Sequence, residues 1–141
     1  IGELRSNQTS KASSQFMAAT NAEFGYNVTV NGTTLTSGNN AIPALASPSG
    51  SATGTSQFGI NLKSNTNPLS GDEVQGPGSA AAGAGYNIPN QYKYQSGDVI
   101  VSVPNANDNS KFTVSYIANI SSSQPPGYYT TTISFICLAN F

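Results

Sequence analysis

The stretch from Gly127 to Phe141 constrains the fold of this chain more than any other. Every second residue from Tyr129 to Phe141 falls on one face at a period of two, and β-branched and aromatic types fill the run. Such alternation is typical of a long strand with one buried face. We therefore expect a strand that is held in a sheet as far as Phe141. Its inward face would include Cys137 as a small buried hydrophobe.

Cys137 is the only cysteine, so an intramolecular disulfide is excluded. If the side chain were not buried, it would be a reactive thiol or would form a disulfide between two chains.

Similar alternation predicts strands throughout the chain, at 16–20, 23–30, 57–63, 91–95, 99–103 and 111–120. Asn31-Gly32 is a strong hairpin signal, because both residues tolerate positive φ, and it predicts a return of the chain through 33–36. The longest turn-rich segments are 37–56 and 64–90. We expect one all-β domain over 16–141. Its architecture would be an immunoglobulin-like or jelly-roll β-sandwich of about seven to nine antiparallel strands.

Residues 1–15 precede this domain and are polar, with Ile1 and Leu4 as their large apolar side chains. Such a segment is expected to be flexible, or to become ordered against a partner. The sequence begins without Met and holds no apolar run of about 18 residues. We therefore expect a secreted product without a membrane span, from which a leader was removed.

The composition argues against several classes of function. Charged residues make up 8% of the chain, and its five lysines and arginines are scattered, whereas a nucleic-acid surface needs clustered cations. The absence of histidine removes the commonest general base and metal ligand, and one cysteine cannot build a thiolate zinc site. No nucleophile or phosphate-loop motif is present. We expect a protein that is not an enzyme and uses no cofactor.

Some further chemistry remains open at this stage. The carboxylate and amide side chains at 105–109 could bind calcium, although such residues are also common in turns. Lys93 or Lys111 could form an isopeptide bond with a strand asparagine, with Glu23 as the assisting acid. Four Asn-x-Ser/Thr sequons mark candidate glycosylation sites, at Asn7, Asn27, Asn31 and Asn119. Several tyrosines could stack on sugar rings, namely Tyr86, Tyr92, Tyr94, Tyr128 and Tyr129.

The run Gly127-Tyr128-Tyr129-Thr130-Thr131-Thr132-Ile133-Ser134-Phe135 resembles the Gly-x-Tyr-x-x-Thr-Val-x-Val ending of spore-coat-U-type secreted proteins and chaperone–usher pilins. The resemblance implies an extracellular subunit of a filament, pilus or surface assembly. Copies of the chain would polymerise head to tail, the N-terminal extension of each filling the open groove of the next. The expected subunit interface comprises Ile1, Leu4, Phe16, Phe135 and Phe141. The alternative is a monomeric adhesin or carbohydrate-binding module that uses Tyr86 and Tyr92.

Overall fold

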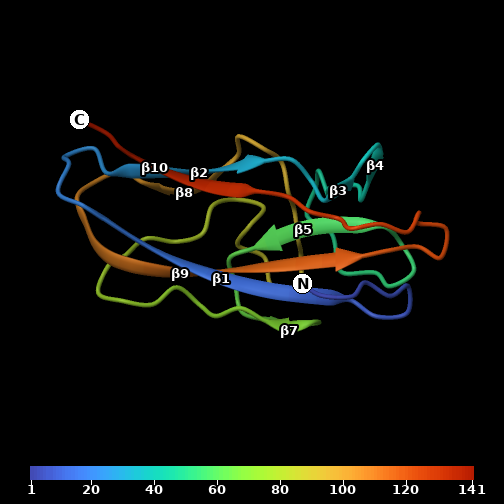
Figure 1. Cartoon of the computed structure of the whole chain (residues 1–141). Helices are drawn as coiled ribbons and strands as arrows, with labels where there is room; N and C mark the ends of the chain where they lie inside the picture. Colours follow the sequence, from blue (N-terminus) through green and yellow to red (C-terminus); the bar gives the residue numbers. More distant parts are fainter.

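The computed structural model describes residues 1–141 and is all-β, without helices (Figure 1). The two main sheets are built from two long strands, two strands of seven residues and two of five residues, and four two-residue strands form two small hairpins. In chain order the strands are β1 (Ser10–Thr20), β2 (Tyr26–Gly32), β3 (Thr36–Ser37), β4 (Asn40–Ala41), β5 (Gln57–Asn61), β6 (Asn65–Thr66), β7 (Leu69–Ser70), β8 (Val99–Val103), β9 (Asn107–Asn119) and β10 (Ile133–Ala139).

Two three-stranded antiparallel sheets lie one above the other in Figure 1. The first, here called the β9 sheet, has the order β1-β9-β5. The second, here called the β2 sheet, has the order β10-β2-β8. The first and last long strands of the chain are therefore each at the end of a sheet, and β9 and β2 are the central strands.

One hydrophobic core fills the space between the two sheets. It contains Tyr26, Val28 and Val30 from β2 together with Phe112 and Val114 from β9, all at most 1% exposed. These residues recur at the period of two that the sequence predicts, because successive side chains of a strand point to opposite faces. The outer face of β9 is buried as well, since loops cover its Thr113, Ser115 and Ile117 side chains.

Two strands are longer than their apolar patterns predict. β1 begins at Ser10 rather than at Phe16, and Ser10 pairs with Ala118, so part of the expected extension belongs to the β9 sheet. β9 begins at Asn107, within a segment predicted as a turn. Backbone pairing needs no large side chain, and the small Ala12 on β1 leaves no apolar signal to mark the strand.

The predicted hairpin at Asn31-Gly32 is wrong. Both residues lie within β2, where they pair with Ser134 and Ile133 of β10. A Cβ on Gly32 would lie 2.3 Å from the carbonyl oxygen of Thr132, so the glycine is needed for the close approach of β10. The hairpin instead joins β3 to β4.

Two further expectations about strands are also wrong. Residues 91–95 form no strand, although Tyr92 and Lys93 make isolated bridges to Ser49 and Ile60. β10 ends at Ala139 and Phe141 is 94% exposed, so the sheet does not hold the strand to that residue.

Candidate functional site: two open sheet edges that meet at a seam

Each of the two main sheets has one covered edge. The outer edge of β8 is bonded by a loop, in which Gly83 donates its backbone N–H to the carbonyl of Ile100. The outer edge of β5 is covered by two loop segments. Leu45 donates its backbone N–H to the carbonyl of Phe58, and Phe58 donates to the carbonyl of Pro43. Ile60 and Lys93 each donate a backbone N–H to the carbonyl of the other. Covering an edge in this way prevents it from pairing with other chains.

The other edge of each sheet is open. β1 pairs only with β9, and β10 pairs only with β2. The two open edges adjoin each other, because Phe16 of β1 stacks on Phe135 of β10 with ring centroids 5.4 Å apart. We call this junction of β1 and β10 the seam. Both strands at the seam are end strands of their sheets.

Phe16 is the main side chain that holds the seam together. Its ring lies 5.1 Å from the ring of Phe112 and 5.4 Å from that of Phe135, at interplanar angles of 22° and 24°. The structure therefore brings together two of the predicted interface residues, Phe16 and Phe135, within one subunit. The other contacts of β1 include its backbone ladder with β9 and three side-chain bonds, Lys11 to Leu69, Ser14 to Tyr116 and Gln15 to Thr113.

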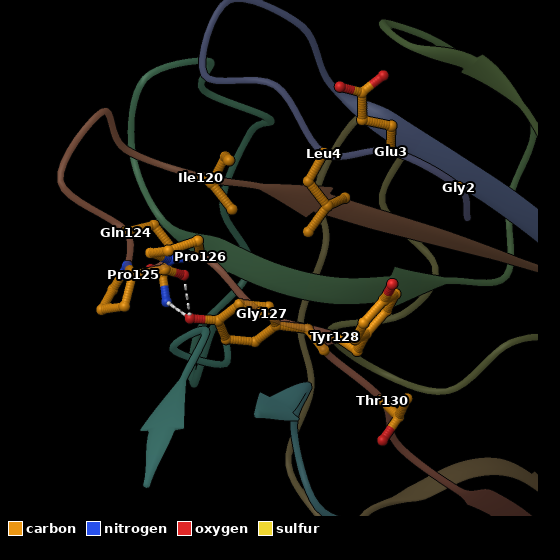
Figure 2. Close-up of a pocket in the computed structure, with 11 residues that line it drawn as sticks. Gly2, Glu3, Leu4, Ile120, Gln124, Pro125, Pro126, Gly127, Tyr128 and Thr130 are labelled. Carbon is orange, nitrogen blue, oxygen red and sulfur yellow. Dashed lines mark hydrogen bonds between the residues drawn. The ribbon is translucent and has the colours of Figure 1, made fainter. Parts of the chain in front are cut away.

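A hollow of about 620 Å³ lies beside the seam, where the N-terminal segment passes the loop before β10 (Figure 2). In Figure 2, Leu4 and Ile120 lie on one side of it and Tyr128 and Thr130 on the other. The hydroxyl of Tyr129 donates to the carbonyl of Pro125 and so fixes the shape of the loop. The backbone N–H groups of 2–4 and 127–129 have no protein partner, so both walls of the hollow carry free hydrogen-bonding groups.

The remaining predicted interface residues occupy separate places. Leu4 is half-buried and packs against the core beside the hollow, whereas Ile1 is half-exposed at a smaller adjoining hollow of about 310 Å³. Phe141 lies at the far end of the molecule from this loop, and its ring is free in solvent. The seam and the hollow thus unite Leu4, Phe16 and Phe135 along one side of the fold, without Phe141.

Cys137 is exposed on β10, so its prediction as a buried hydrophobe is wrong. The error comes from the position of Cys137 along β10. Phe135, in the first half of the strand, stacks on Phe16, whereas the residues from Ile136 to Ala139 are all exposed. Partial burial still raises the pKa of the Cys137 thiol.

The four sequons differ in accessibility. Asn7 is exposed in a turn, and Asn27 and Asn31 lie on the outer face of β2. Asn119 is 1% exposed, and its side-chain amide donates to Ser51 and Gln57. In the folded protein the Asn119 side chain is therefore not accessible, whereas glycosylation at Asn7, Asn27 and Asn31 stays a prediction.

Most of the tyrosines proposed for sugar stacking are part of the core. Tyr86, Tyr92 and Tyr94 are at most 3% exposed, so none of the three offers a ring face to a ligand. Tyr129 is half-buried against the core, and Tyr128 is 94% exposed at the hollow.

Lys93, one of the lysines considered for an isopeptide bond, forms an ion pair with Asp98 at 2.5 Å. Tyr86 donates its hydroxyl to the same carboxylate at 2.8 Å. Burial alone would raise the pKa of Asp98, but the hydrogen bonds from Lys93 and Tyr86 outweigh it and lower the pKa. Lys93 is thus paired with this carboxylate and not with a strand asparagine, and Glu23 is exposed in the turn after β1. The cluster fits a salt bridge that anchors a loop.

The loop considered for calcium is largely used in internal bonds. Asn107, Asp108 and Asn109 belong to β9, where the carbonyl of Asn109 accepts from Gly78 and the side chain of Asn107 bonds to the hydroxyl of Ser79. No three acidic, cysteine or histidine side chains converge in the structure.

Sequence reasoning missed the walls of the hollow and the openness of β10. The signal for the hollow was weak, because Pro125 and Pro126 read simply as a turn. The open edge of β10 has no signal in its own sequence, because it follows from the position of the strand at the end of its sheet.

The structure contains no helix that could cross a membrane. No family model matches the chain, and neither the curated proteins nor the solved structures give a match.

Proposed function

We propose that this chain is a structural subunit of an extracellular filament or surface assembly, and that copies polymerise by exchanging β1 and the residues before it. In the exchanged form, β1 of one subunit would occupy the place beside β9 in the next. The main observation in favour is that β1 is an uncovered end strand, and that it lies at the seam next to β10, the other uncovered end strand. We further propose that the two sheets form an immunoglobulin-like or jelly-roll β-sandwich, completed by the donated strand.

The first support is that few large side chains anchor β1. It spans 11 residues, but its inward positions carry the small Ala12, Ser14 and Ala18 around one large side chain, Phe16. A buried aromatic side chain contributes about 1.5 to 3 kcal/mol. Detachment of β1 breaks a single backbone ladder, and it takes from the core only Ala18 and the Phe16 ring that packs against it.

The second support is that exchange conserves the contacts. The register of β1 with β9, from Ser10 opposite Ala118 to Ala18 opposite Ser110, would be the same within one chain or between two. Only the turn from Asn21 to Gly25 must open. A short connection of this kind favours domain swapping, and a contact that passes from subunit to subunit without closing yields a filament.

The third support is the low charge of the chain. Net charge is −1 and charged residues make up 8% of the sequence, so little electrostatic repulsion opposes the association of copies.

The decisive experiment is a disulfide trap across β1 and β9. Met17 and Lys111 are register partners on the outer face of the β9 sheet, and opposed residues of antiparallel strands lie within reach of a disulfide. The variant Met17→Cys/Lys111→Cys, in a Cys137→Ser background, is allowed to assemble under reducing conditions and is then oxidised. Exchange of β1 predicts a ladder of covalent multimers on denaturing gels and filaments by electron microscopy.

The control carries Met17→Cys alone and should stop at dimers. Oxidation before assembly should lock β1 in its own subunit and leave monomers that no longer polymerise. Internal crosslinks alone in assembled material would refute strand exchange. Dispersed particles under all assembly conditions would refute the filament.

A second candidate function is carbohydrate binding by a monomeric adhesin. The observation in its favour is Tyr128, whose exposed ring stands at the mouth of the hollow with Glu3, Gln124 and Thr130 nearby. An aromatic wall with a few polar groups is typical of small-ligand sites. Tyr128→Ala should abolish glycan-array binding under this reading, while the same change should leave filament formation by β1 intact.

A further inference from the structure

The outer face of the β2 sheet carries an apolar surface that the exchange of β1 does not use. Ile136 and Leu138 of β10 point outward and are 44% and 62% exposed. Val99 of β8 lies on the same face, because it pairs with Thr29, which in turn pairs with Ile136, and it is 45% exposed.

The rest of this face is polar but uncharged. Its other members are Asn27, Thr29, Asn31, Ser102 and Ser134, and none of the residues in β2, β8 or β10 carries a charge. A surface without charge has no electrostatic preference for an oppositely charged partner, and it does not repel a second copy of itself. The face is therefore suited to self-association.

The size of the face limits what one pair of subunits can do. Seven residues of strand are about 23 Å long, and three strands are about 14 Å wide, which gives a footprint of roughly 300 Å². A stable pair of proteins needs about 800 Å² from each partner. One such contact between two free subunits is too small to hold them together.

We propose that this outer face, centred on Ile136, Leu138 and Val99, is a lateral contact through which filaments of this chain associate side by side. The inference rests on the proposed polymerisation, since only a polymer repeats the face many times. Repetition converts a weak contact into a strong one, and linked contacts can raise the overall affinity by about 10² to 10⁴. Bundling is thus restricted to assembled material, and free subunits remain apart.

The test compares wild type with Ile136→Thr/Leu138→Thr, both produced in a host without N-glycosylation, because a glycan on Asn27 or Asn31 would cover the face. Threonine is β-branched and suited to a strand, and at both positions it removes apolar surface. The matched control is Leu69→Thr, which removes a leucine that is 73% exposed on β7, away from the β2 sheet. The measurements are the fraction of filaments in bundles by electron microscopy and the protein pelleted at low centrifugal speed.

Wild type and Leu69→Thr should give bundles, and the double variant should give single filaments of normal length, with at least a tenfold loss of low-speed pellet. Bundles that persist in the double variant, or single filaments in wild type, overturn the lateral contact while leaving polymerisation intact. An absence of filaments in wild type overturns both proposals. Thermal unfolding of the double variant at the wild-type temperature confirms that any loss of bundling does not come from misfolding.

Discussion

Replacing Phe16 by alanine tests whether the seam is held as described. The ring makes two stacked contacts, with Phe112 at 5.1 Å and with Phe135 at 5.4 Å. Aromatic pairs contribute about 0.5 to 1.5 kcal/mol each beyond burial. Complete truncation of a buried Phe costs about 3 to 5 kcal/mol. Phe16 is only partly buried at an open edge, so we expect Phe16→Ala to lower the free energy of unfolding by about 2 to 4 kcal/mol.

The neighbouring residue supplies a matched control. Met17 is on the same strand, but its side chain points to the opposite face and is 62% exposed. Met17→Ala should therefore change stability by less than about 0.5 kcal/mol. Urea unfolding, followed by circular dichroism under reducing conditions and at a protein concentration that keeps the chain monomeric, measures both values.

A double-mutant cycle with Phe135→Ala isolates the contact across the seam. We expect a coupling energy of about 0.5 to 1.5 kcal/mol between Phe16 and Phe135. If Phe16→Ala lowers the free energy of unfolding by less than about 1 kcal/mol, or if the coupling energy with Phe135 is zero, the ring of Phe16 does not hold the seam together. The reasoning that assigns the anchoring of β1 to Phe16 would then be wrong.

Three further predictions concern the chemistry of individual side chains. Asp98 has a lowered pKa, so its contribution to stability is present above the unfolded value of about 4 and is lost as pH falls through the folded value. The free energy of urea unfolding of Asp98→Asn should change less between pH 6 and pH 2 than that of wild type. The same change of the free energy with pH in both proteins would contradict this. Asn65→Ala should cost about 1 to 3 kcal/mol, because it removes a fully buried side-chain amide and leaves the partly buried backbone N–H of Asn90 without its acceptor. Asn87→Ala, an exposed change in the loop that contains Asn90, should be neutral in the same assay. The exposed Cys137 should react with iodoacetamide in the native protein, at a rate that still rises above pH 9 because its pKa is raised, and protection until unfolding would contradict its placement on the open edge.

The periodic strands could be predicted because their signal is local. Alternation identified the central residues of β2, β5, β8 and β9, where each apolar position faces the same core. The start of β1 could not be predicted, because Ala12 and Ser14 carry no apolar signal and the strand is defined by pairing with a segment about a hundred residues later.

The prediction at Asn31-Gly32 failed for a similar reason. Its local preference for a turn is overridden by the approach of β10, a strand at the other end of the sequence. Within the candidate site, the aromatic residues Phe16 and Phe135 were predicted, whereas the open edges depend on which loops cover β5 and β8. That information belongs to the topology and is absent from any short stretch of sequence.

The order of the strands also has a kinetic consequence. β1 is the first strand to be synthesised, but its partner β9 follows after β8, so Ser10 must wait for Ala118. Contacts between such distant segments close slowly, since the entropy of closing a long loop is lost before the pairing is gained. During this interval, a neighbouring chain whose β9 has formed but is not yet paired with its own β1 competes for the same strand. Refolding at increasing protein concentration should therefore divert chains from monomer to polymer, and the outcome would be decided by the timing of β1 capture as much as by equilibrium stability.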